Sequence, residues 1–138
     1  MDIKKLLIGG IVASILFFGL GWLVYDQLLG SFMANHPGEM IADRAKADVQ
    51  MMYLVIGNVC FGFALAFIFA KANIGSAVNG FITGAVIGGL FSGGIDSIIY
   101  ALTKIESKTM VAADVAASAV IWGIVGAVVA MVTAGKKS

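Results

Sequence analysis

The chain has 138 residues, of which 60% are hydrophobic and 12% are charged, and its formal net charge is +1. Soluble domains carry about 25% charged residues, so this composition excludes a fully hydrated globule and indicates that part of the surface faces lipid. The small net charge argues against a nucleic-acid partner, because phosphate binding requires concentrated Lys and Arg.

Four uncharged apolar stretches follow one another, at 6–25, 49–70, 72–95 and 115–135. Each has about 20 residues or more, the length that an α-helix needs to cross the hydrocarbon core of a bilayer. Backbone polar groups in lipid must pair within their own segment, which favours helices, and the alternation typical of membrane strands is missing. We therefore predict an all-α integral membrane four-helix bundle with antiparallel neighbouring transmembrane helices, at about 4–26, 38–70, 75–103 and 109–134.

The first stretch follows Lys4 and Lys5, as in a secretory signal, but it ends in large residues where a signal peptidase needs small ones. We expect it to be retained as the first helix.

The orientation of the chain in the membrane follows from the positions of its lysines and arginines. The two chain ends and the turn between the second and third stretches carry five of them, and the segments on the other side of the membrane carry four. This difference predicts a multi-pass protein of the inner (plasma) membrane with both termini in the cytoplasm.

A polar segment, 26–48, separates the first two stretches and is predicted to be an extracytoplasmic loop. Asn35 suits a helix cap and Pro37 suits a first helical turn, so the second helix is expected to start near Pro37. His36 and Glu39 have a spacing that two metal ligands on a helix can have, but a single histidine with carboxylates is a weak ligand set. We predict no metal site and no cofactor.

The amide side chain of Asn58 lies near the middle of the second stretch. An amide is costly to expose to lipid, so Asn58 is expected to face another helix, as an interhelical contact or as part of a ligand site.

The third stretch has glycines spaced by four residues, which places each set on one helix face: Gly80, Gly84 and Gly88, and then Gly89 and Gly93. Without side chains, two helix backbones can approach closely at such a face. The fourth stretch offers a counterpart surface of alanines and glycines. Two interpretations remain open: a tight hairpin between the third and fourth helices, or a glycine face that is left for oligomerisation.

Asp96 lies in the third helix, about 9 Å inside its end at 1.5 Å per residue. Acids inside a membrane usually face a bundle interior or a wet cavity and have a partner. The candidate partners are Lys104, the hydroxyls of Ser92, Ser97 and Tyr100, and Asp114 on the next helix, which could share a proton with Asp96 because two nearby acids at low dielectric raise the pKa of one of them. Asp96 is either a proton or cation site, with Asp114, Asn58 and Tyr100 around it, or a structural hydrogen-bonding group.

The segment 21–33, Gly-Trp-Leu-Val-Tyr-Asp-Gln-Leu-Leu-Gly-Ser-Phe-Met, resembles the end of the first helix in a family of small bacterial membrane proteins known as domain of unknown function 1761. Residues 79–88 are similar to the third helix of that family. The tryptophan of the family's Trp-Tyr pair is displaced here to Trp22, and Phe32 or Met33 replaces a later tryptophan. The resemblance implies a bacterial protein with four helices and implies no known activity.

No nucleophile signature or phosphate-binding glycine loop is present in the sequence, so we do not expect an enzyme. The glycine faces favour a non-enzymatic packing role in the lipid bilayer, as a homo-oligomer or as an accessory subunit of a larger membrane complex. The alternative is a small cation or proton transporter or channel that uses the carboxylate of Asp96.

Overall fold

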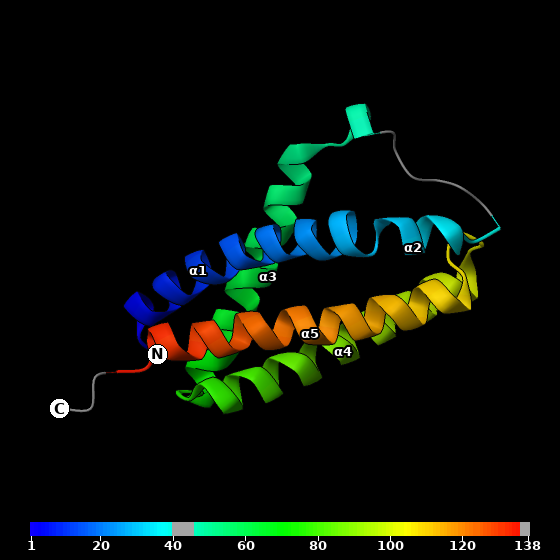
Figure 1. Cartoon of the computed structure of the whole chain (residues 1–138). Helices are drawn as coiled ribbons and strands as arrows, with labels where there is room; N and C mark the ends of the chain where they lie inside the picture. Colours follow the sequence, from blue (N-terminus) through cyan, green and yellow to red (C-terminus); the bar gives the residue numbers. More distant parts are fainter. Residues whose placement is uncertain (40–45, 136–138) are drawn as a thin grey trace.

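A computed structural model describes residues 1–39 and 46–135, and over these residues every regular element is helical (Figure 1). The long helices are α1 (Ile3–Gly21), α3 (Met51–Ala72), α4 (Ala77–Leu102) and α5 (Lys108–Thr133), and α2 (Gly30–Asn35) is short. Together with the turn that follows α1, these make four helical segments that are long and apolar enough to cross a membrane. The all-α prediction is confirmed for the described residues.

The first helical segment does not end at Asp26. A π-helical turn, Trp22–Leu28, continues α1. At its end, the N–H of Leu29 donates to the carbonyl of Val24 at 2.7 Å. The helix then resumes as α2 up to Asn35. The predicted loop therefore begins some ten residues too early, because no proline interrupts the chain before Pro37 and the chain can stay helical until then.

The second long helix, α3, begins at Met51 and not near residue 38. Residues 36–39 are held elsewhere, because Ser107 donates a hydrogen bond to the carbonyl of His36 at 2.6 Å and Lys104 forms an ion pair with Glu39 at 3.0 Å. These contacts tie the chain after α2 to the loop between α4 and α5. Part of the predicted helical extension, residues 40–45, lies outside the described residues.

The ends of α4 and α5 lie within two residues of their predicted positions, and capping explains them. The hydroxyl of Ser76 accepts from the N–H of Asn79 at 3.3 Å, and that of Ser107 accepts from the N–H of Met110 at 3.1 Å. At the other end of α3, Asn73 adopts a left-handed conformation with φ of 54°, which stops the helix.

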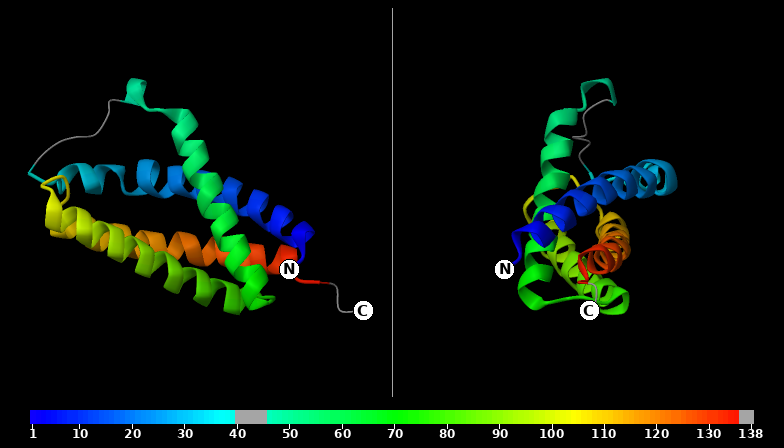
Figure 2. Two further views of the ribbon diagram at one scale, coloured as in Figure 1. Left: turned by 180° about the vertical axis from the view of Figure 1, so that it is seen from behind. Right: turned by 90° about the vertical axis from the view of Figure 1, so that its left-hand side faces the viewer.

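The axes of three long helices, α1, α4 and α5, are roughly aligned, and the axis of α3 is inclined to them (Figures 1 and 2). Figures 1 and 2 show α4 lying along α5, with α1 packed over α5, whereas α3 crosses behind them at a steep angle. The core, which includes Leu65, Phe69, Val125 and Val129, lies where the second half of α3 meets the other helices. The first half of α3 diverges, and Met52 and Tyr53 there are 72% and 70% exposed.

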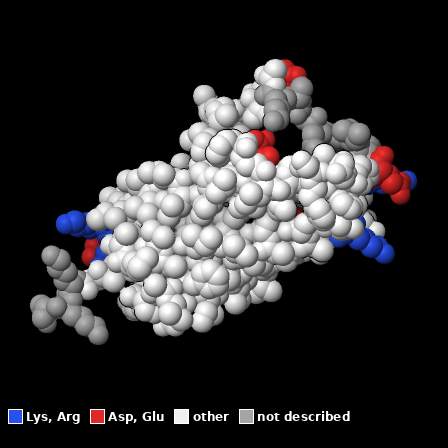
Figure 3. Space-filling view, in the orientation of Figure 1, with Lys and Arg blue, Asp and Glu red and all other residues white. Residues whose placement is uncertain are grey.

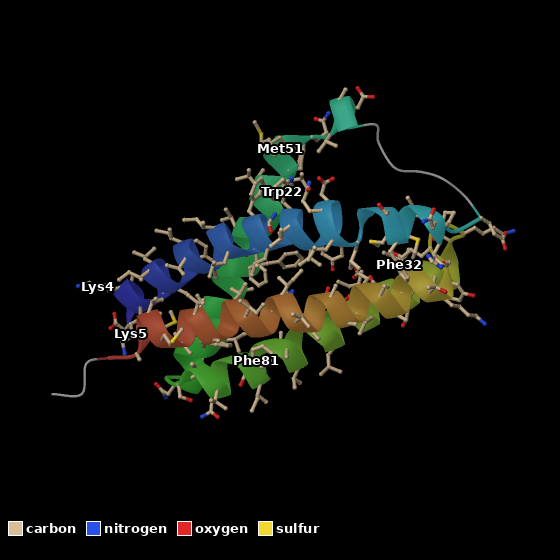
Figure 4. The ribbon with its side chains drawn as sticks, in the orientation of Figure 1. Lys4, Lys5, Trp22, Phe32, Met51 and Phe81 are labelled. Atoms are coloured by element: carbon tan, nitrogen blue, oxygen red, sulfur yellow. The ribbon has the colours of Figure 1, made fainter. Side chains whose placement is uncertain are left out.

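The two ends of the described chain lie together, with the side chain of Lys5 near Gly135 and near the turn after α3. Figure 4 shows Lys4 and Lys5 at this end of the molecule. In the space-filling view of Figure 3, charged side chains gather toward the ends and the upper edge, and the broad surface between them is uncharged. This distribution is the one expected of a bundle with a lipid-facing middle.

Candidate functional site: a central cavity with a pair of carboxyl groups

The glycines predicted in the third helix face α5. A Cβ atom added to Gly80 would collide with the carbonyl oxygen of Gly126, and one added to Gly84 would collide with the carbonyl oxygen of Trp122. A Cβ on Gly88 would strike the ring of Trp122. The backbones of α4 and α5 therefore approach as closely as glycine allows, and the partner of this face is within the same chain.

Gly89 and Gly93 lie at the edge of the same contact. Added Cβ atoms there would stand 3.6 Å from Ala119 and 3.8 Å from Val115, which are ordinary van der Waals distances. These two glycines therefore face α5, but the packing there would also accommodate a Cβ atom at either position.

Close packing between α4 and α5 also fixes the aromatic ring of Trp122, which sits over Gly88. Rings from three other helices surround it: Phe17 of α1 at 4.8 Å between centroids, Phe61 of α3 at 5.5 Å and Phe91 of α4 at 6.3 Å. Trp122 could not be singled out from the sequence, because nothing local distinguishes a tryptophan within an apolar stretch. We call these four rings the aromatic cluster.

A second close approach joins α1 to α3. A Cβ on Gly62 would collide with the hydroxyl of Ser14, and one on Gly10 would lie 2.6 Å from the ring of Phe63. The two helices cross at this point, in the middle of α3. Because α3 is fixed there and inclined to the others, its first half leaves a space between itself and α4 and α5.

That space is a cavity of about 820 Å³, which we call the central cavity. All four long helices line it, and the aromatic cluster forms one part of its wall. Figure 4 marks two more lining residues, Trp22 and Met51, near the start of α3. Its volume lies within the range of about 300–1,000 Å³ that is typical of small-molecule sites.

A pair of acids also lines the cavity. The hydroxyl of Ser92 is 2.8 Å from Asp96 Oδ2 in the next turn of α4 and 2.7 Å from Asp114 Oδ2 of α5. The Asp96 side chain is only 7% exposed. A serine hydroxyl has one proton to donate, so it can donate to only one of these carboxylates at a time. The other contact is satisfied when that second carboxyl group carries a proton and donates to Ser92 Oγ.

Tyr25 brings the π-helical turn after α1 to the same place. Its hydroxyl shares a hydrogen bond of 3.0 Å with the hydroxyl of Ser118 on α5, and both residues lie beside the acid pair. Capping of α5 by Ser107 leaves Asp114 in the second turn of that helix and available to the cavity. Polar groups from α1, α4 and α5 therefore converge on one point.

Glu106, in the loop between α4 and α5, adds a further carboxyl group outside the long helices. Burial, and secondarily the charge of Asp114, raises the pKa of its carboxyl group above its ordinary value. Its Oε2 atom is buried and has no hydrogen-bond partner among the described residues.

Two of the predicted site residues do not join the acid pair. Asn58 lines the cavity, but its amide donates to the carbonyl of Leu54 in its own helix at 2.7 Å, not to another helix. Tyr100 is 39% exposed and is not among the lining residues. In the described part of the chain, no three His, Cys, Asp or Glu residues are arranged to hold a metal ion, and His36 contacts the carbonyl of Phe32 at 2.7 Å.

No family model, no curated protein and no solved structure matches this chain. The function is therefore inferred from the geometry of the cavity and its acid pair.

Proposed function

We propose that this protein is a small non-enzymatic transporter that passes protons, or a cation in exchange for protons, across a membrane. Four helices cross the bilayer in this proposal, and α4 and α5 form an antiparallel hairpin. The observation that carries it is the placement of Asp96 and Asp114 on two different helices, both within hydrogen-bond distance of the Ser92 hydroxyl, in the wall of a cavity within the apolar zone. Ionisable groups at such depth are costly and are commonly functional.

The geometry of the pair is suited to proton exchange. With one proton between them, the two carboxyl groups and Ser92 form an unbroken chain of hydrogen bonds. Loss of that proton leaves two carboxylates that compete for one hydroxyl, a state that a cation in the cavity would stabilise. Binding of a cation and release of a proton are thereby coupled.

The other proposal, a packing or accessory role as a homo-oligomer, receives less support. It rested on a glycine face left for another molecule, whereas Gly80, Gly84 and Gly88 are covered by α5. Such a role would have to use other surfaces, such as those around Gly19, Gly57 and Gly94, where an added Cβ would meet nothing within 4 Å.

For orientation, we propose that both termini face the cytoplasm of a plasma-membrane protein. The cluster of Lys5, Gly135 and the turn after α3 places the N-terminal lysines and Lys71 on one side. In a Cys60→Ser background, we expect Lys104→Cys to react with a membrane-impermeant maleimide in intact cells and Lys5→Cys to react only after permeabilisation. The reverse pattern would invert the topology, and reaction of both in intact cells would contradict a spanning bundle.

Proton flux tests the transport proposal directly. Liposomes that contain the purified protein and a trapped pH-sensitive dye are expected to acidify after an external acid step, and Asp96→Asn should return the rate to that of empty liposomes. Asp48→Asn is the matched control, because Asp48 is exposed and lies outside the spans. Equal rates for the wild type and Asp96→Asn, or a wild-type rate no higher than that of empty liposomes, would refute the proposal.

A further inference from the structure

The central cavity is far larger than a proton or a metal ion requires. Its volume of about 820 Å³ matches a drug-sized molecule. Most of its wall is apolar, and in the described part of the chain no three acidic, His or Cys side chains converge as ligands of a metal. A bare or hydrated inorganic ion would therefore fill only the region of the acid pair and leave the rest of the cavity without a partner.

The acid pair is a negative feature of the cavity wall. Asp96 and Asp114 line the cavity, and among the described residues that line it none is a lysine or an arginine. A neutral occupant, such as a lipid acyl chain, would fit the apolar wall but would give the carboxyl groups no counter-charge. Carboxylates at low dielectric interact strongly with a positive charge, so the charge of the wall favours a cation.

The apolar wall is also suited to a cation, because it is aromatic. Phe17, Phe61, Phe91 and Trp122 are mutually packed at centroid distances from 4.8 to 6.3 Å, and each comes from a different helix. Trp22 adds a further ring to the lining. Aromatic faces attract organic cations, and desolvated sites built from such rings bind quaternary ammonium groups.

From these observations we infer that the central cavity binds a lipophilic organic monocation, such as a quaternary ammonium or phosphonium that carries aromatic or alkyl groups. The positive centre lies near Asp96 and Asp114, and the apolar substituents lie among the rings of the aromatic cluster. The inference names the substrate class for the proposed transporter and rests on that function, since the same acid pair binds the proton and the organic cation.

The test uses two ions of nearly the same shape and opposite charge, tetraphenylphosphonium and tetraphenylborate. Both tryptophans of the chain, Trp22 and Trp122, line the cavity, so binding to the protein in nanodiscs of neutral lipid is measurable as quenching of intrinsic fluorescence. We expect saturable quenching by the phosphonium and none beyond partition into empty nanodiscs by the borate. Asp96→Asn should weaken phosphonium binding by about tenfold or more, whereas Asp48→Asn should not change it.

Equal binding of the two ions by the wild-type protein would identify an uncharged lipid-tail pocket and overturn the inference, as would equal phosphonium affinity in the wild type and Asp96→Asn. The comparison of two ions on the wild-type protein stands even where a variant fails to fold. Asp96-dependent proton flux without phosphonium binding would refute the substrate class alone. Asp96-dependent phosphonium binding without proton flux would refute transport and leave the binding site intact.

Discussion

Replacing Gly84 by leucine is expected to unfold the hairpin of α4 and α5. The site of the new side chain is occupied by the carbonyl oxygen of Trp122, which belongs to a helix backbone and cannot move aside as a side-chain tip can. Overpacking of a tight interface costs about 1–3 kcal/mol for a few added methylene groups, and a leucine beside a fixed carbonyl should reach about 3 kcal/mol or more. Thermal unfolding of the purified protein in a mild detergent, followed by circular dichroism, measures the loss.

Gly94→Leu is the matched control, because it adds the same side chain to the same helix where nothing lies within 4 Å of the new Cβ. It should leave the midpoint of unfolding nearly unchanged. Equal midpoints for Gly84→Leu and Gly94→Leu would contradict the close packing of α4 on α5. A change in oligomeric size for Gly84→Leu at unchanged stability would show that another copy of the chain, and not α5, covers this face.

The existence of the long helices could be predicted because it depends on a local property. Four stretches are apolar over a length that spans a bilayer, and capping residues such as Ser76 and Ser107 mark where helices begin. The beginning of α3 at Met51 could not be predicted, because it depends on contacts of His36 and Glu39 with the distant loop after α4.

The arrangement of the helices was harder to predict than their existence. Helices that are apolar on every side carry little information about which face turns inward. The regular glycine spacing of α4 was informative, whereas Gly62, which sets the crossing of α1 and α3, has no glycine four residues before or after it in its helix. The steep inclination of α3, and with it the central cavity, therefore had no sequence signal.

The acid pair was partly predictable. Asp96 is conspicuous as a carboxyl group well inside an apolar stretch, and the short loop after α4 brings Asp114 near it. Ser92, one turn before Asp96, was one of its predicted partners, and the contact between them is confirmed. The aromatic cluster was not predictable, because its rings come from four helices and meet only after those helices have packed.

Ser92→Ala is expected to destabilise the fold through the acid pair. The Ser92 hydroxyl contacts both Asp96 and Asp114, so its removal takes one hydrogen-bond partner away from both carboxyl groups at the interface of α4 and α5. Leaving buried polar groups unsatisfied costs about 1–3 kcal/mol. The loss is measured as the change in unfolding free energy in mild detergent at neutral pH.

A double-mutant cycle separates this effect from general damage by the substitution. In an Asp114→Asn background one of the two competing charges is gone, so Ser92→Ala should cost less than in the wild type, with a coupling of about 0.5–3 kcal/mol. Ser14→Ala is the control, because the hydroxyl of Ser14 donates to the carbonyl of Gly10 in its own helix at 2.6 Å, and its effect should be independent of Asp114→Asn. Additive effects of Ser92→Ala and Asp114→Asn would mean that the serine does not join the two carboxyl groups, and the route for a shared proton between α4 and α5 would be lost with it.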